Sequence, residues 1–312
     1  LAYACLAAGL PPTLDLAELL RCAPQLSKPW LHAAFALLLI GYGTKMGLAP
    51  MHAWKPDAYG EAPGVVGMLL AGGLTNCAFL ALIRVWHVCH AAGEGGHVGT
   101  LLVFFGLLSM AVAAVFMTGQ RDIKRMLAYS SIEHMGILAL GLGLGGAALF
   151  GTLLHMVNNG ITKGVLFLSA ANIHRAYGGK TIDDVRGAMR RLPLSGGLFL
   201  AGFLAITGAP PFAPFISEFS IITAAIGMER FWSAGLFLVI LMIVFVGMGS
   251  TVLAVLEGKV PSAARETPYR DGLWTGGAPL ALMGGVLLLG LSIPSPLMQM
   301  ILAAVRYLET TP

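Results

Sequence analysis

The chain has 312 residues, of which 57% are hydrophobic and only 11% are charged. A soluble domain carries roughly 25% charged residues, so most of this protein's surface cannot face water and a lipid bilayer is its expected environment. The net charge of +4 comes from scattered residues, without the basic stripe and interleaved aromatics that follow phosphates, which excludes a nucleic-acid partner.

The chain begins with an apolar run at 1–10. This run has no basic region before it and no small-residue cleavage site after it, so it does not have the pattern of a signal peptide. We interpret it as a truncated first span, and we expect the sequence to be a fragment that lacks upstream helices.

Further apolar runs follow, each with the length of about 20 residues that a helix needs to cross a bilayer. They lie at 30–49, 64–90, 98–118, 125–144, 147–172, 194–227, 232–257 and 274–293. The sequence therefore predicts an all-α, polytopic transmembrane bundle of about nine helices over residues 1–293. The shorter run at 295–308 predicts an interfacial tail at 294–312.

Two of the predicted spans are interrupted by glycine and proline. The run at 194–227 is too long for one helix, and a Gly-Ala-Pro-Pro-Phe-Ala-Pro segment at 208–214 lies in its middle. A weaker interruption, Gly-Leu-Ala-Pro at 47–50, follows the run at 30–49. Proline removes backbone donors, and irregular backbone at membrane depth is stable only inside protein or beside a wet cavity. Two discontinuous helices in one bundle are typical of a transport site.

The predicted loops differ in charge between the two sides of the bundle. Alternating sides along the chain groups the loops at 50–63, 119–125, 173–193 and 258–272, which hold 12 of the 19 basic residues, against 5 on the other side. Loops with such an excess face the cytoplasm. We therefore predict a multi-pass protein of the inner (plasma) membrane with these four loops cytoplasmic. The longest, 173–193, should lie as an amphipathic segment at the membrane surface.

Ionisable side chains also occur inside the predicted spans, where each costs at least ~2.5–3.5 kcal/mol on insertion scales. Such groups normally face the bundle interior and serve ion pathways. The candidates are Lys45, Glu133, His134, His155, Lys163 and Glu218. His155, Asn159 and Lys163 follow at four-residue spacing, so we expect them along one helix face, where they can relay protons.

Each candidate also has a purely structural interpretation. Lys45 can extend to the membrane surface from the end of its span, and Glu218 can cap a half-helix. Glu133 and His134 can form an ion pair between helices. His155 can be a core histidine whose hydrogen bonds are satisfied. The sequence leaves these alternatives open.

The sequence shows no motif for a metal or a cofactor. The cysteines at positions 5, 22, 77 and 89 have no CxxC spacing, and His87 and His90 have no further ligands nearby. The glycines lie in apolar runs rather than in a nucleotide-binding fingerprint. We therefore expect no catalytic residue, no cofactor and no metal in this chain.

Four segments, in chain order, resemble the antiporter-like family of membrane subunits. Residues 43–63 resemble its first broken helix, 122–136 its tenth helix, 155–168 its eleventh and 208–219 its broken twelfth. The family comprises the large proton-pumping membrane subunits of respiratory complex I, their counterparts in membrane-bound hydrogenases, and the multi-subunit sodium/proton antiporters. The Glu-His-Met-Gly at 133–136 is similar to the hydrogenase branch, that is, to hydrogenase-4 component F or formate hydrogenlyase-like subunits.

This resemblance implies a role for each buried group. Lys45 is then the pump lysine of the first broken helix, Lys163 the central lysine, and Glu218 the terminal proton carrier. His134 and His155 are relay residues between them. On this interpretation the chain moves protons along buried lysine, histidine and glutamate side chains.

The resemblance also implies the setting. The chain is expected to be a membrane subunit without redox chemistry of its own, joined to other membrane subunits and to a peripheral redox module of the NADH:quinone oxidoreductase or hydrogenase type. Asn76 stands where the family commonly has a bridging lysine in its eighth helix, and an amide can pass a hydrogen bond but holds no charge. Two other interpretations stay open: a subunit of a multi-subunit sodium/proton antiporter, and a scaffold whose polar residues only hold helices together.

Overall fold

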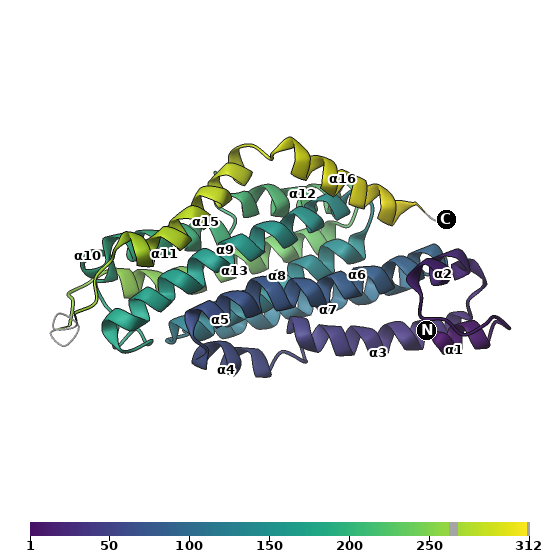
Figure 1. The fold of residues 1–312 in the computed structure, drawn as a ribbon, viewed down its shortest axis with the longest axis horizontal. Coiled ribbons are helices and arrows are strands. Elements are labelled where there is room, and N and C mark those ends of the chain that lie inside the picture. The colour runs from purple at the N-terminus through teal and green to yellow at the C-terminus, as the bar shows by residue number, and fades with distance from the viewer. Residues whose placement is uncertain (262–267, 311–312) are drawn as a thin grey trace.

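The computed structural model describes residues 1–261 and 268–310, and this part of the chain is helical, without a strand. Figure 1 shows an elongated bundle whose long helices run side by side along its longest axis. The helices are α1 (Ala2–Leu6), α2 (Leu16–Arg21), α3 (Lys28–Met46), α4 (Trp54–Glu61), α5 (Gly64–Leu69), α6 (Thr75–Ala91), α7 (Gly95–Met117), α8 (Ile123–Leu144), α9 (Ala148–Tyr177), α10 (Ala188–Arg191), α11 (Pro193–Ile206), α12 (Ala213–Gly227), α13 (Phe231–Leu256), α15 (Leu273–Leu291) and α16 (Ser295–Glu309). The predicted all-α bundle is confirmed.

Five helices in the described part of the chain are long and apolar enough to cross a membrane. One is the continuous segment Gly64–Ala91, in which a π-helical turn at Leu70–Leu74 joins α5 to α6. The others are α7, α8, α13 and α15. Each coincides with a predicted span to within a few residues, because a mainly apolar run of about 20 residues is long enough to predict a membrane helix.

Helix α8 lies at the centre of the bundle. In its most apolar stretch 83% of the residues are buried, whereas in the other four spans the buried share is between 28% and 44%. Helix α7 packs closely on it, since a Cβ added to Gly106 would lie 2.7 Å from the carbonyl oxygen of Gly136. Small residues let two helices approach backbone to backbone. A helix covered on all sides in this way can hold polar side chains away from lipid.

Helix α9 packs against α8, α11, α12 and α15 and is longer than its predicted span at 147–172. It ends at Tyr177, where Gly178 adopts a left-handed conformation with φ 71°. A histidine and an arginine in its last turn suit the negative end of the helix dipole, so these polar residues extend the helix beyond the apolar run. The predicted amphipathic segment at 173–193 is therefore wrong in its first part. In the rest of it, Ala188–Arg191 is helical.

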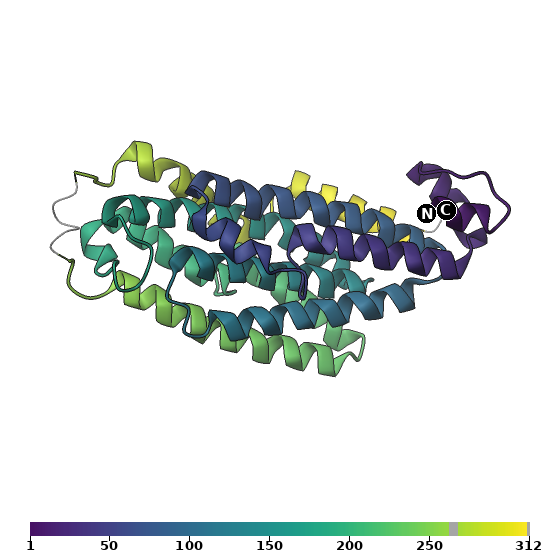
Figure 2. The ribbon, with the colours of Figure 1, turned by 90° about the horizontal axis from the view of Figure 1, so that it is seen from below.

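Both predicted interruptions are present. Gly47, with φ 81°, ends α3, and the chain re-enters a helix at Trp54. Gly208, with φ 70°, lies between α11 and α12. Only glycine adopts such angles without strain, so glycine fixes the place of each break. Figure 1 shows α3 and α4 along one edge of the bundle and α11 and α12 on the other side of α8, and Figure 2 has α3 and α4 nearest the viewer.

The four basic loops meet at one end of the bundle, on the left in Figure 1. Four ion pairs join three of them: Arg125 to Asp57, Lys180 to both Glu61 and Asp122, and Arg121 to Asp183. The guanidinium of Arg191 donates to the carbonyl oxygen of Tyr269 in the fourth. Arg265 of this group lies outside the described residues. The loops predicted to share one side therefore share one end of the molecule.

The apolar run at 1–10 is helical over Ala2–Leu6, and Gly9 turns the chain with φ 75°, so the truncated span expected there stays a prediction. Helix α16 buries Ile301 and Leu308 against the core and leaves its other face exposed. Its amphipathic character fits an interfacial tail, and that position in a membrane stays a prediction.

Candidate functional site: a buried polar chain between two helix breaks

Helix α8 holds four polar side chains in its buried middle. Ser130, Ser131, Glu133 and His134 are each at most 1% exposed. The register of the helix is set at its start, where the side chain of Asp122 accepts hydrogen bonds from two backbone N–H groups of the first turn. Because α8 is enclosed by other helices, these polar groups can contact only each other and the neighbouring helices.

Lys163 reaches α8 from α9. Its side chain is fully buried, and its Nζ donates a hydrogen bond to Ser130 Oγ at 2.7 Å. Among the described residues no carboxylate lies within ion-pair distance of this amine. Burying a charge without an ion pair is costly, so the charge of Lys163 responds strongly to any charge that appears nearby.

Two histidines link α8 to α9 and α12. His134 Nδ1 and His155 Nε2 are 3.0 Å apart, and the two rings stack with centroids 5.1 Å apart. The other ring nitrogen of His155, Nδ1, lies 2.9 Å from Ser217 Oγ on α12. His155 therefore has a hydrogen-bond partner at each nitrogen, which lets the ring accept a proton on one side and release one on the other.

Glu218 follows Ser217 at the second helix break. Its side chain is 3% exposed, and a carboxylate oxygen lies within 4.8 Å of ring nitrogens of both His134 and His155. Gly208, between α11 and α12, makes room for it, because a Cβ at that position would overlap Glu218 Oε2. The break thus supplies both the left-handed backbone and the space that the carboxylate occupies.

The structure places Lys45 on the outside of the bundle, so its predicted place in the interior is wrong. Lys45 lies in the last turn of α3, where a long side chain can extend away from the core. The buried lysine at this break is Lys55, which is 0% exposed in α4. The sequence makes Lys55 look like a loop charge, because the stretch at 50–63 has no apolar run.

The first helix break supplies the acceptors for Lys55. Its Nζ donates to the carbonyl oxygen of Met46, the last residue of α3, at 2.6 Å, and lies 3.4 Å from the carbonyl oxygen of Ser131 on α8. Gly47 admits the lysine stem, since a Cβ there would lie 2.5 Å from Lys55 Cδ. Carbonyls at a helix C-terminus are unpaired and carry partial negative charge. Lys55 therefore meets α8 one residue from the acceptor of Lys163.

Three asparagines lie near the chain and differ in their contacts. Asn158 Nδ2 donates to the carbonyl oxygen of Ala213, at the start of α12, at 2.8 Å. Asn159 is buried, and neither its amide nitrogen nor its oxygen has a partner in the described protein. Asn76 is half-buried and donates to the carbonyl oxygen of Met156 at 3.0 Å, so it ties α6 to the backbone of α9.

Several polar atoms of the site have no hydrogen-bond partner in the described protein. They are both carboxylate oxygens of Glu133, Nε2 of His134, Oδ1 of Asn158, both amide atoms of Asn159 and Oε1 of Glu218. A structural ion pair between Glu133 and His134 does not account for them, because the closest approach is 3.5 Å and forms no hydrogen bond. Buried polar groups are normally paired, so these atoms favour a path for protons or water over a static core.

The donor set of His134, His155 and Glu218 is close enough to hold a metal ion. Protein zinc sites have four ligands, or three ligands and an open position. His155, however, already uses one nitrogen toward His134 and the other toward Ser217. A metal would displace one of these hydrogen bonds, so the arrangement fits a proton relay better than a resident ion.

The structure brings five of the sequence candidates into one buried group: Glu133, His134, His155, Lys163 and Glu218. Sequence reasoning missed three members, namely Lys55, Ser130 and Ser217. The signal for Ser130 is its place four residues before His134, on the same helix face. No sequence signal separates the inward Lys55 from the outward Lys45.

Comparison with known proteins adds a family match. Residues 2–246 match the family described as NADH:quinone oxidoreductase/Mrp antiporter, transmembrane. A hydrogenase-4 component F homolog of Methylacidiphilum infernorum is 40% identical over 204 residues, which cover 65% of this chain and 43% of that protein. NADH-quinone oxidoreductase subunit N of Desulforudis audaxviator is 34% identical over 210 residues, covering 67% of this chain and 42% of that protein.

The fold of this chain is also similar to that of a protein of known structure. A chain of the membrane-bound sulfane sulfur reductase, an archaeal respiratory membrane complex, superposes with a TM-score of 0.87 at 25% identity, over 98% of this chain and 62% of that one. The present chain spans less than half the length of the two sequence relatives. The matched range 2–246 includes both helix breaks and every residue of the buried polar chain.

Proposed function

The chain belongs to the NADH:quinone oxidoreductase/Mrp antiporter transmembrane family, and on that premise we propose that it carries protons across the membrane as a subunit of a redox-driven complex. Protons move along the buried lysine, histidine and glutamate side chains between the two helix breaks. The chain performs no redox step itself, and it works as the part of the complex that converts a charge movement into transport.

The observation that supports this proposal is the continuity of the buried polar chain. Lys55 and Lys163 meet α8 at adjacent residues. His134 lies about one turn, or ~6 Å, further along the same helix. From there hydrogen bonds lead through His155 to Ser217, and Glu218 lies beside both rings. No other group of buried ionisable side chains in the described residues connects the two breaks.

Transfer along this chain follows from electrostatics in a dry interior. A proton that arrives at Lys163 places a positive charge about one helical turn from Glu133 and His134, and little solvent screens it. Each protonation therefore changes the proton affinity of the next group. Unpaired oxygens of Glu133 and Glu218 offer acceptors for bridging water where no direct hydrogen bond exists.

The relatives support the setting. One is named as a hydrogenase-4 component F homolog, another as a subunit of NADH-quinone oxidoreductase, and the structural neighbour belongs to a respiratory membrane complex. We infer other membrane subunits and a peripheral redox module as partners, and the higher identity favours the hydrogenase type. We place the protein in the inner (plasma) membrane with the loops at 50–63, 119–125, 173–193 and 258–272 in the cytoplasm. The charge bias of these loops persists when the buried Lys55 is left out.

Substitution of Lys163 tests the proposal. The full-length protein is studied within its complex in membrane vesicles, with a dye that reports proton uptake and with an assay of the complex's electron transfer. We expect Lys163→Ala and the volume-conserving Lys163→Met to yield assembled complexes that no longer take up protons. A scaffold role predicts loss of assembly instead. An assembled Lys163→Met complex that pumps at the wild-type rate would refute the proposal.

Sodium transport is the second candidate. The unpaired amide oxygens of Asn158 and Asn159 are buried neutral oxygen atoms, the kind of ligand that hard cations prefer. Vesicles assayed with and without sodium separate the two functions. Proton transport that needs no sodium supports the pump, and transport that requires sodium on the opposite side supports an antiporter.

A further inference from the structure

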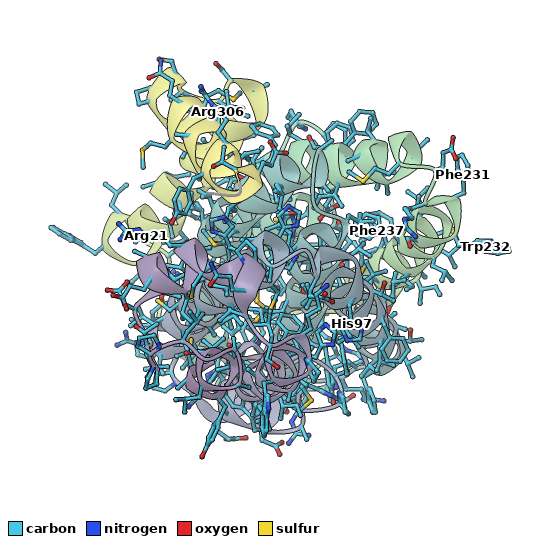
Figure 3. The ribbon with its side chains drawn as sticks, turned by 90° about the vertical axis from the view of Figure 1, so that its right-hand side faces the viewer. Arg21, His97, Phe231, Trp232, Phe237 and Arg306 are labelled. Carbon is cyan, nitrogen blue, oxygen red and sulfur yellow. The ribbon has the colours of Figure 1, made fainter. Side chains whose placement is uncertain are left out.

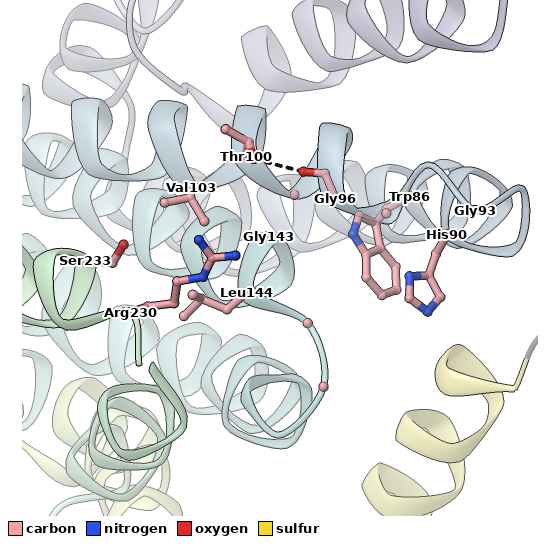
Figure 4. A pocket seen from close by; sticks show the side chains of 14 residues that line it. Trp86, His90, Gly93, Gly96, Thr100, Val103, Gly143, Leu144, Arg230 and Ser233 are labelled. Atoms are coloured by element: carbon pink, nitrogen blue, oxygen red, sulfur yellow. Dashed lines mark hydrogen bonds between the residues drawn. The ribbon is translucent and has the colours of Figure 1, made fainter. Parts of the chain in front are cut away.

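A glycine-lined cavity of about 420 Å³ lies at the end of the bundle opposite to the basic loops. It is enclosed by the end of α6, the start of α7, the turn after α8 and the start of α13, and Figure 4 shows it from close by. Half of its lining residues are glycines. Backbone N–H groups and a few side chains, chiefly Trp86, His90, Arg230 and Ser233, therefore decide what it can bind. None of them belongs to the buried polar chain.

The charge of the cavity comes from Arg230. It is the one arginine, and there is no lysine, aspartate or glutamate, among the lining residues. Its guanidinium forms no ion pair within the described part of the chain, and in Figure 4 it points into the cavity. The nearby Glu94 is already bound by Lys28 and His32 of α3. The cavity therefore presents an unpaired positive charge.

The start of α7 adds donors to this charge. The helix begins at Gly95, and the backbone N–H groups of Gly95 and Gly96 have no acceptor among the described residues. The free N–H groups and the dipole of a helix N-terminus favour an anion. Gly96 has no side chain and open space where one would stand, so a ligand can reach the backbone there directly, whereas the ring of His90 covers Gly95.

Trp86 supplies an independent indication of a ligand. Its side chain is 2% exposed, yet its Nε1–H has no hydrogen-bond partner. Stacking on His90, with ring centroids 5.0 Å apart, holds the indole in place. Figure 4 shows the N–H on the edge of the ring that faces the cavity and Arg230. A buried indole N–H normally finds an acceptor, and an anionic oxygen in the cavity would provide one.

The surroundings of Arg230 indicate which anion. Phe231 and Trp232, the next two residues, are 63% and 88% exposed and stand out at the rim of this end in Figure 3. Exposed aromatics of this kind mark the headgroup level of a bilayer. Helix α13 continues with exposed Leu236 and Val239, along which acyl chains can lie. We propose that this cavity binds the phosphate group of a membrane phospholipid.

Lipid retention by the full-length protein in its complex tests this site. Native mass spectrometry after detergent delipidation and titration with phosphatidylglycerol counts the bound lipids. We expect Arg230→Ala to weaken binding of one lipid by roughly tenfold, because a charge-assisted hydrogen bond is lost. Arg230→Lys keeps the positive charge but not the planar guanidinium group, so its lipid affinity should lie between those of the wild type and Arg230→Ala. Trp86→Phe, which keeps an aromatic ring but removes the N–H and the second ring of the indole, should weaken binding by about threefold.

Controls decide between the possible sources of phosphate. Arg306→Ala removes another exposed arginine at the same end, away from Phe231 in Figure 3, and should leave lipid binding unchanged. Equal retention of phosphatidylglycerol by the wild type and the Arg230 variants overturns the proposal. Binding of inorganic phosphate that depends on Arg230, without a matching effect on the lipid, overturns it as well and indicates a soluble anion. If the Arg230→Ala complex does not assemble, the lipid binding of the Arg230→Lys and Trp86→Phe complexes is compared with that of the wild type instead.

Discussion

Lys45 and Lys55 lie on either side of the same helix break, yet their side chains have opposite surroundings. The Lys55 amine is enclosed by carbonyl oxygens of α3 and α8, whereas Lys45 is exposed. Gly47 explains the burial of Lys55, because the absence of a Cβ at Gly47 leaves room for the aliphatic part of the Lys55 side chain beneath the end of α3. Whether a charged side chain near a helix break is buried or exposed thus depends on the course of the backbone through the break.

Substitution of both lysines tests this assignment. We expect Lys55→Met to abolish proton uptake in vesicles, because the amine that joins the first break to α8 is lost. Its thermal stability should be unchanged or raised, since replacing buried charges by apolar residues of similar volume is often neutral or stabilising by ~1–4 kcal/mol. Lys45→Met is the matched control and should pump normally. Normal uptake by Lys55→Met with loss in Lys45→Met would reverse the assignment.

Gly208 offers a second test at the scale of one residue. Gly208→Ala places a Cβ on a left-handed backbone and into Glu218 Oε2. We expect it to cost ~1–3 kcal/mol of stability and to impair proton uptake by displacing the carboxylate. Gly227→Ala, at the end of α12 with open space around its Cα, is the control and should stay close to wild type. Thermal unfolding and uptake assays on both variants measure the difference, and an equal effect would argue against a tight fit at Gly208.

At the scale of the element, the sequence predicts most of what the structure shows. Mainly apolar runs of membrane-spanning length fix α7, α8, α13 and α15, and glycine with proline fixes both breaks. What it does not predict are contacts between distant segments. Ser217 reaches His155 across 62 positions, and Lys55 reaches Ser131 across 76. Such contacts depend on how helices pack, which periodicity within one helix does not encode.

Glu94 shows how a loop residue joins elements. It lies between α6 and α7 and holds α3 through Lys28 Nζ and His32 Nε2, each at 2.7 Å. The hydrogen bond from Lys28, with a second from His32, lowers the pKa of Glu94 below its ordinary value of 4.5. A carboxyl with a lowered pKa in the folded state adds stability above the unfolded pKa, and that stability is lost as the pH falls through the folded value.

This linkage predicts a pH-dependent difference between wild type and Glu94→Gln. The wild type should have the higher Tm at about pH 7, and its advantage should shrink below about pH 4.5 as the carboxylate is protonated. Thermal unfolding of the purified protein over this range measures it. Glu257→Gln, which removes an exposed carboxyl group far from Glu94 in the sequence, is the matched control. A constant difference at every pH would show that the ion pair at Glu94 does not stabilise the fold.

For the whole molecule, α8 connects two breaks that lie on its opposite sides. Lys55 approaches it from the first break, and His155 joins it to Ser217 and Glu218 at the second. Each break ends a helix inside the protein, where partial charges of free backbone groups face the polar chain. The interior is therefore polar along one path and apolar elsewhere, an arrangement that directs a charge along the molecule instead of into lipid.

The direction of transport depends on which end faces the cytoplasm. Charge bias predicts that the end with the ion pairs of Arg121 and Lys180 is inside. Single cysteines at Asp183→Cys, in that end, and at Glu229→Cys, in the opposite end, report orientation when the accessible native cysteines are replaced by serine. A membrane-impermeant maleimide should label Glu229→Cys on intact cells, and Asp183→Cys only in permeabilised cells or inverted vesicles. The reverse pattern would invert the protein in the membrane and would contradict the predicted cytoplasmic position of the four basic loops.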